Sequence, residues 1–391
     1  MNRSEFRGNL TLPGRACYGV VAVEGETIAS VKEEGPVRPD APWIVPGFID
    51  IHFHGLGIYD FMSLEALCGT AGFAPSTGIT CFTPAMGACD WRDELDFLRN
   101  TRELTLHPVP GTVCAGAHLE GPYLAPSNRG GMAERFLRIP NETEVAELID
   151  TADGTLRLVT LAPEVENAEP AIQQFCAAGA TVSAGHTGWS PECFSHAVDA
   201  GIRHVCHLFD AFDGREVREG VSQFSLADAC LLDDRVTVEL IADGFHVPFP
   251  LLRLAVKAAS PDRIVIITDA LQGAGLPDGK YISESGDEYQ LNNDSVCRAV
   301  LPPYEIVGSC LTMIKAFQNL VLKNGYPPET VSQMVSANPA RVIGLENETG
   351  QLKEGLAADL NILSNRDFSL RECIVRGTTA WLEKDAVPVL L

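Results

Sequence analysis

The hydrophobic pattern of the chain predicts a repeated alternation of strands and helices. Eight short apolar runs rich in β-branched residues end in turn residues or polar side chains, and a segment of helical character follows each. The runs cover residues 44–51, 78–83, 112–119, 156–161, 180–185, 203–207, 236–241 and 263–268. Eight strands alternating with helices favour an α/β protein with a parallel sheet closed into a (β/α)8 barrel of the TIM type.

The segments between the runs have the apolar periodicity of amphipathic helices. They lie at residues 64–76, 91–105, 142–150, 168–178, 191–200 and 250–259. Two begin with helix-start signals, because Asn141 precedes Glu142 as a capping residue and Ser190 precedes a proline at the first helical position.

The two ends of the chain have a different pattern. Short β-prone runs at 9–31 and 349–390 are interrupted by glycines and charged turns. We expect them to form one small β-sandwich domain from residues 1–47 and 346–391, which leaves residues 48–345 for the catalytic barrel. The polar, aperiodic segment 280–307 is either a lid or an insertion before the next helix.

Composition excludes several classes of function. The chain has 391 residues, 46% of them hydrophobic, without a long apolar stretch, so we expect a globular protein with no membrane span. The N-terminus lacks the pattern of a secretory signal, which favours the cytoplasm. The net charge of −23 disfavours binding to nucleic acid or anionic membranes. The 12 cysteines are scattered singly, as free thiols usually are.

The most informative motif is PGFIDIHFHG, in which His52 and His54 lie two residues apart at the end of the first run. Alternate side chains of an extended strand share a face, so both imidazoles can converge on one cation. Two histidines alone are weak evidence, because structural roles are more common. Other runs also end in potential ligands, which are His118, Glu120, His186, His207 and Asp269.

The carboxyl ends of barrel strands meet at one mouth, where such barrels have their active sites. Imidazole and carboxylate groups gathered there suit Zn²⁺, as one or two ions, with Fe²⁺ as another possibility. Asp269 is better placed as a proton shuttle than as a ligand. No lysine lies between Lys32 and Lys257, so a carboxylated lysine cannot bridge two ions, and Glu120 is the candidate acidic ligand.

The order of motifs resembles that of the N-acetylglucosamine-6-phosphate deacetylase family of the amidohydrolase superfamily, over about residues 43–363. The motifs that carry the resemblance are PGFIDIHFHG, HLEGPYL, GHTG, HLFDAF, ELIADGFHV, TDALQGAG, GSCLTM and SANPARVIGL. The resemblance implies Glu120, His186 and His207 as ligands of the principal metal ion, and His52 and His54 as ligands of a second. It also implies Asp269 as catalytic acid/base and His246 as a contact of the sugar.

The same resemblance implies an activity and an assembly. The activity is metal-dependent hydrolysis of the acetamide of N-acetylglucosamine 6-phosphate, giving glucosamine 6-phosphate and acetate. The assembly is a homodimer in which an arginine helps to bind the phosphate of the neighbouring subunit's substrate. In this chain the matching loop, DAFDGREVREG, offers Arg215, which we favour, and Arg218; both can equally be surface residues.

Two substrate-pocket positions depart from the family pattern. Asp210, next to Ala211, replaces an asparagine, and Met132 replaces a histidine. A carboxylate near a sugar phosphate is unfavourable, so the alternative is a deacylase that acts on another N-acyl amino sugar or a related amide. A third possibility is a barrel that has lost catalysis and serves as a binding protein, but retention of every predicted ligand argues against it.

Overall fold

The computed structural model describes residues 3–212, 214–282, 288–291, 296–299 and 306–383. Each of the eight predicted runs contains at least one strand. Seven parallel strands form the main sheet, in the order β16-β15-β12-β11-β10-β9-β7. They are β7 (Ala85–Gly87), β9 (Ala117–Glu120), β10 (Leu156–Leu161), β11 (Thr181–Ala184), β12 (His204–Val205), β15 (Thr237–Ile241) and β16 (Ile264–Ile267).

A second parallel sheet lies beside the main one. It contains β5 (Phe48–Asp50), β6 (Ile79–Phe82) and β8 (Val113–Cys114). The segments that follow β5 and β16 are joined by several backbone hydrogen bonds, among them those from Asp269 N to His52 O at 2.9 Å and from His54 N to Ala270 O at 2.7 Å. The assigned strands thus form a curved half-barrel and a smaller sheet, and closure of all eight into one barrel stays a prediction.

Six helices match the six predicted helical segments. They are α1 (Leu64–Phe73), α2 (Trp91–Leu106), α3 (Glu142–Ala152), α4 (Ala168–Ala177), α5 (Pro191–Ala200) and α7 (Phe249–Ala259). The predicted start of α3 is confirmed, because the Asn141 side chain accepts a hydrogen bond from Glu144 N at 3.0 Å. The other helices are α6 (Leu226–Leu232), α8 (Met313–Gln318), α9 (Pro328–Ser332) and α10 (Asn338–Val342). Among the described residues, no helix is both long and apolar enough to cross a membrane.

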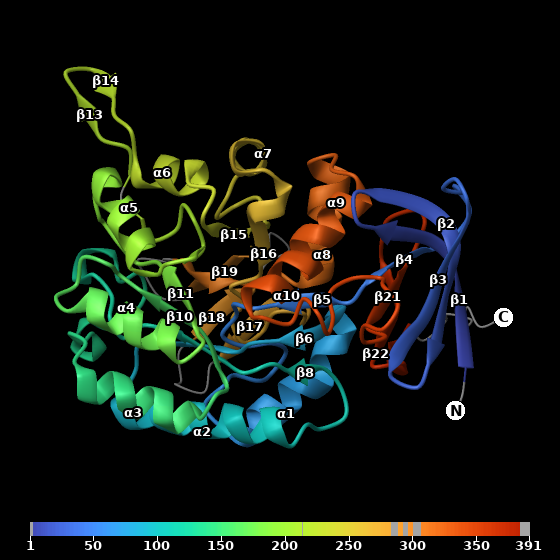
Figure 1. Cartoon of the computed structure of the whole chain (residues 1–391), viewed down its shortest axis with the longest axis horizontal. Helices are drawn as coiled ribbons and strands as arrows, with labels where there is room; N and C mark the ends of the chain where they lie inside the picture. Colours follow the sequence, from blue (N-terminus) through green and yellow to red (C-terminus); the bar gives the residue numbers. More distant parts are fainter. Residues whose placement is uncertain (1–2, 213, 283–287, 292–295, 300–305, 384–391) are drawn as a thin grey trace.

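Strands from both ends of the chain share one sheet, which lies at one side of the molecule (Figure 1). Its order is β23-β22-β21-β4-β1-β2-β3. The bounds are β1 (Arg3–Leu12), β2 (Arg15–Glu24), β3 (Thr27–Gly35), β4 (Trp43–Pro46), β21 (Leu360–Leu363), β22 (Leu370–Val375) and β23 (Thr378–Leu382). The predicted single β-unit is one continuous seven-stranded sheet, because β4 pairs with both β1 and β21; its folding into a sandwich stays a prediction. The predicted end of this unit, residues 384–391, lies outside the described residues.

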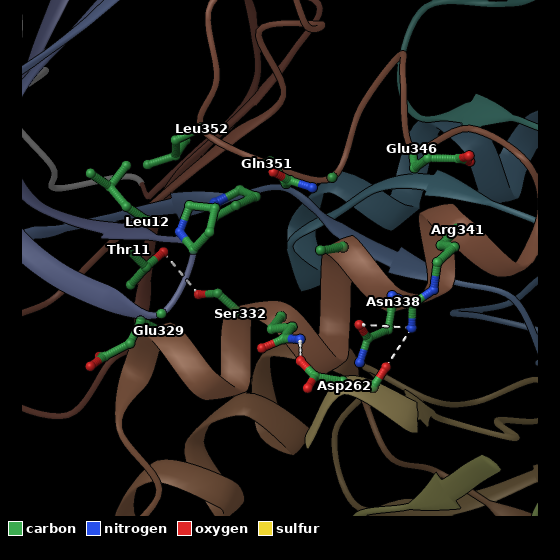
Figure 2. Close-up of a pocket in the computed structure, with 16 residues that line it drawn as sticks. Thr11, Leu12, Asp262, Glu329, Ser332, Asn338, Arg341, Glu346, Gln351 and Leu352 are labelled. Carbon is green, nitrogen blue, oxygen red and sulfur yellow. Dashed lines mark hydrogen bonds between the residues drawn. The ribbon is translucent and has the colours of Figure 1, made fainter. Parts of the chain in front are cut away.

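A cavity of about 380 Å³ lies where the β1–β2 turn meets α9 and α10 (Figure 2). Ser332 Oγ donates to Thr11 Oγ1 at 2.9 Å, and the Arg341 guanidinium donates to the backbone oxygen of Asp262. Asp262 precedes the start of β16, whereas Asp269 follows its end. The cavity therefore lies at the opposite end of this strand from the predicted site.

The described parts of the segment 280–307 belong to an inserted sheet. Its four antiparallel strands are β17 (Gly279–Ile282), β18 (Glu288–Leu291), β19 (Val296–Ala299) and β20 (Ile306–Ser309). Leu291 and Cys297 are buried against Leu271 and Leu276, which follow β16. The segment is thus an insertion between β16 and α8, packed on the loop after Asp269; residues 283–287, 292–295 and 300–305 of this segment lie outside the description.

Candidate active site and metal centre

Four histidines surround the carboxylate of Glu120, which ends β9. Glu120 Oε1 lies 2.7 Å from His207 Nε2, 3.0 Å from His186 Nε2 and 3.2 Å from His52 Nε2. Glu120 Oε2 lies 3.2 Å from His54 Nε2. These side chains lie at or after the ends of four strands, β5, β9, β11 and β12, so the fold brings all five predicted metal ligands together. Glu120 and His186, for example, are 66 residues apart along the chain.

Asp269 completes the cluster from the end of β16. Its Oδ1 lies 3.3 Å from His54 Nε2 and 3.8 Å from His52 Nε2. Asp269 and His186 both have positive φ angles, 49° and 51°, which side chains other than glycine rarely adopt. Such strained backbone persists where the surrounding structure holds it, and it concentrates at functional sites.

The rings of His54 and His186 are oriented by backbone carbonyls. His54 Nδ1 lies 3.0 Å from Ala85 O, and His186 Nδ1 lies 2.9 Å from Asn128 O. A carbonyl oxygen only accepts, so each Nδ1 carries a proton, and each Nε2 faces Glu120, where a bound ion would take it as a ligand. Metal-ligating histidines have this arrangement, in which one ring nitrogen is bonded to an oxygen and the other is left for the ion.

Glu239 orients two of the other ligands and was missed by the sequence analysis. Its Oε2 accepts from His52 Nδ1 at 2.9 Å and from His207 N at 3.0 Å, while Oε1 lies 2.9 Å from His204 Nε2. The side chain is fully buried on β15. A carboxylate inside an apolar strand is rarely buried without partners, and that signal in the run 236–241 could have identified it.

The donor set fits a divalent cation. Ligand atoms of His52, Glu120, Cys206 and His207 lie within 4.8 Å of one another, as do those of His52, His54 and Asp269. His52 Nε2 is buried without a well-aligned hydrogen bond. Cys206, also missed by the sequence analysis, places its Sγ 3.7 Å from Glu120 Oε1. Nitrogen, oxygen and sulfur donors around a buried carboxylate are the ligands that zinc and similar ions prefer.

The electrostatics of the cluster favour positive charge. Burial opposes ionisation of Glu120, but His52 and His186 beside it hold its pKa well below the usual range. Burial also opposes protonation of His54, yet Asp269 and Glu120 raise its pKa to about 9. Buried carboxylates that stabilise protonated histidines also stabilise a metal cation, which takes the place of the protons.

His246 lies at the edge of the cluster. Its Nδ1 lies 2.6 Å from Asp243 Oδ2. Burial lowers the pKa of His246, but Asp243, Asp269 and Asp210 raise it above the usual value, so both predicted acids lie near its ring. Ala211 has a positive φ of 51°, and its N–H donates to Asp210 Oδ1 at 3.1 Å. His246 thus lies within electrostatic reach of Asp210 and Asp269.

The remaining predicted residues have other contacts. Met132 is half-buried, and its Sδ accepts from Ala88 N at 3.3 Å.

The two predicted arginines lie on and beside the hairpin of β13 (Val217–Arg218) and β14 (Val221–Ser222). Arg218 belongs to β13 and Arg215 precedes it. The hairpin projects from the body of the molecule (Figure 1). Arg215 pairs with Asp228 at 2.6 Å and Arg218 pairs with Glu216 at 2.9 Å. No described contact joins either arginine to the histidine cluster of the same chain.

Comparisons with known proteins identify the family of the chain. The model of the amidohydrolase family matches residues 43–380. The chain is 32% identical over 353 residues to the N-acetylgalactosamine-6-phosphate deacetylase of Escherichia coli O157:H7, covering 90% of each chain. It is 29% identical over 383 residues to the N-acetylglucosamine-6-phosphate deacetylase of Bacillus subtilis, covering 94% of each.

A solved structure extends the likeness to the whole fold. A mutant N-acetyl-D-glucosamine-6-phosphate deacetylase from Mycobacterium smegmatis, in complex with N-acetyl-D-glucosamine-6-phosphate, is 27% identical with a TM-score of 0.87. The alignment covers 97% of this chain and 100% of that one. The chain belongs to the amidohydrolase family and, within it, to the N-acetylglucosamine-6-phosphate deacetylase family.

Proposed function

We propose that this protein is a metal-dependent hydrolase that converts N-acetylglucosamine 6-phosphate and water to glucosamine 6-phosphate and acetate. The observation that carries the proposal is the convergence of four histidine Nε2 atoms on Glu120, with Asp269 beside them. The names of the relatives in E. coli and B. subtilis support the substrate class, an N-acetylated amino sugar phosphate.

Glu120, His186 and His207 would hold the principal ion, and His52 and His54 would hold a second. Zn²⁺ suits these donors best, with Fe²⁺ as the alternative. When bound, such an ion supplies Lewis acidity for the acetamide carbonyl and for the attacking water.

Asp269 would move the proton of the reaction. Its carboxylate accepts a proton from the attacking water and delivers it to the departing nitrogen, so that acetate and a free amine result. His246, with Nδ1 held by Asp243, can direct Nε2 to a sugar hydroxyl or the phosphate. Glu120, His186 and His207 are buried, so bulk water is excluded from the proposed ligands of the principal ion.

The direct test is acetate release by the purified protein after its metal content has been measured. We expect turnover of N-acetylglucosamine 6-phosphate, and a loss of at least about 100-fold in kcat for Asp269→Asn. Metal content of the variant should match the wild type, which separates proton transfer from ion binding. An unchanged rate in Asp269→Asn would exclude the assigned shuttle.

A second candidate substrate is N-acetylgalactosamine 6-phosphate. The E. coli relative of that name is 32% identical, and Asp210 marks a pocket that differs from the family pattern. The two substrates differ only in the configuration at C4. Comparison of kcat/KM for the two epimers decides between them, with unphosphorylated N-acetylglucosamine as a third substrate.

We also propose a cytoplasmic homodimer whose eight parallel strands close into one barrel. The hydrogen bonds between the segments after β5 and β16 support closure. The exposed apolar residues Val217, Val221 and Phe224 on and beside the β13–β14 hairpin support self-association through this arm.

A further inference from the structure

A buried carboxylate that the proposed mechanism does not use lies where two segments of the site meet. Asp50 ends β5, two residues before His52, and it is fully buried. Its Oδ2 accepts a hydrogen bond from Thr268 Oγ1 at 2.6 Å, and its Oδ1 accepts longer ones from His52 N at 3.3 Å and Thr268 N at 3.4 Å. A buried carboxylate is costly unless hydrogen bonds satisfy it, and both segments that supply them here lead into the site.

The bonds of Asp50 cross the seam between the segments that follow β5 and β16. Thr268 directly precedes Asp269, whose N–H donates to His52 O at 2.9 Å on the other side of the seam. The Thr268 hydroxyl also accepts from Ala270 N at 3.3 Å. Asp50 is therefore bonded to Thr268 directly and to Ala270 through this hydroxyl, on both sides of Asp269.

Asp269 needs outside support to keep its position. Its φ of 49° lies in the left-handed region, a conformation that costs free energy for a residue with a side chain and persists only where neighbouring groups hold it. Its Oδ1 lies 3.3 Å from His54 Nε2. Misplacement of a reacting group by about 1 Å can cost on the order of 100-fold in rate. The bonds that Asp50 makes to the neighbours of Asp269 therefore bear on proton transfer as well as on stability.

We propose that Asp50 is a positioning residue, which holds the carboxylate of Asp269 in place through the hydroxyl of Thr268. This inference rests on the proposed function and adds the groups that support its proton shuttle. The hydroxyl is the link, because it donates to Asp50 and accepts from Ala270 N. Its removal takes the closest donor from Asp50 Oδ2 and frees Ala270 N, so Asp269 loses support on both sides.

The test removes this hydroxyl with Thr268→Val, which has almost the same shape. With N-acetylglucosamine 6-phosphate and the rate expressed per bound ion, we expect kcat to fall about 10- to 100-fold with KM little changed. Metal content should match the wild type. Thr268→Ser restores the hydroxyl and should recover most of the rate.

The matched control is Thr349→Val. Thr349 Oγ1 donates to the likewise buried Asp359 Oδ2 at 2.7 Å, immediately before β21 of the terminal sheet. This variant loses the same kind of buried hydrogen bond away from the site, so we expect its kcat to equal that of the wild type.

A double-mutant cycle separates positioning from a general structural role. In the Asp269→Asn background, Thr268→Val should change the residual rate by less than about twofold, because the group that it positions is already gone. A general loss of structure would lower the rate equally in both backgrounds. Asp50→Asn, which keeps the size of the side chain and removes its charge, is the second variant if Thr268→Val does not fold, and the same pattern is expected.

The outcomes distinguish this inference from the proposed function. Equal losses in the two backgrounds, or an unchanged kcat in the folded variants, would overturn the positioning role and leave the proposed function intact. A rise in KM with kcat unchanged would do the same. If the wild type hydrolyses no N-acetylhexosamine 6-phosphate, the proposed function fails together with this inference.

Discussion

At the residue scale, Glu239 connects two of the proposed metal ligands, His52 and His207, with His204. Its carboxylate accepts from His52 Nδ1 and from the backbone of His207, and it faces His204. In Glu239→Gln one oxygen becomes an amide donor, which cannot accept from His52. We expect affinity for Zn²⁺ to fall about 10- to 100-fold, measured by competition with a chromophoric chelator. Glu103→Gln, an exposed change on α2, is the control; equal affinities would show that Glu239 does not support the site.

Glu94 on α2 should make stability depend on pH. The side chain is 1% exposed, and burial raises its pKa to about 8 from an ordinary value near 4.5. The unfolded chain releases this proton at lower pH than the folded protein, so the contribution to folding is complete below about pH 4.5 and is lost as pH rises to 8.

The neutral variant Glu94→Gln should remove this dependence. We expect its free energy of unfolding to exceed that of the wild type at pH 8, by on the order of a few kcal/mol, and to approach it near pH 5. Urea unfolding across this range measures the difference. Parallel curves for the variant and the wild type would show that Glu94 titrates normally in the folded protein.

At the scale of elements, the β13–β14 hairpin is the feature that a dimer would use. Val217 and Val221 are 61% and 63% exposed. Changing both to serine should weaken self-association about tenfold or more, because apolar burial at the interface is lost. Sedimentation velocity over a concentration series measures it. Leu106→Ser, at an exposed apolar position on α2, is the control; identical behaviour of both variants would remove the hairpin from the interface.

At the scale of the whole molecule, an ion bound by residues from several strands should stabilise the fold. A ligand that binds only the folded state at 100 times its Kd adds about 2.7 kcal/mol. Chelation should therefore lower Tm in calorimetry, and added Zn²⁺ should restore it, whereas Mg²⁺, which prefers oxygen ligands, should not. A Tm that is insensitive to chelation would contradict a structural contribution of the ion.

Local patterns in the sequence predicted the positions of the strands and six helices. The start of α3 followed from Asn141 alone, because capping depends on residues three apart. The sequence also predicted that the two ends of the chain form one β-unit, but the order in which their strands pair could not be predicted in this way. It depends on β4 pairing with β1 on one side and β21 on the other, and pairing between distant strands leaves no local signal.

The sequence by itself determined which side chains end the strands, and so identified Glu120, His52 and Asp269 as candidates for one site. Strand alternation and the carboxyl-end rule for parallel sheets are sufficient for that step. Only the tertiary structure decided which buried groups support them. The role of Glu239 depends on its contacts with His52 and His204, which come from other strands, and such contacts are set by packing rather than by periodicity.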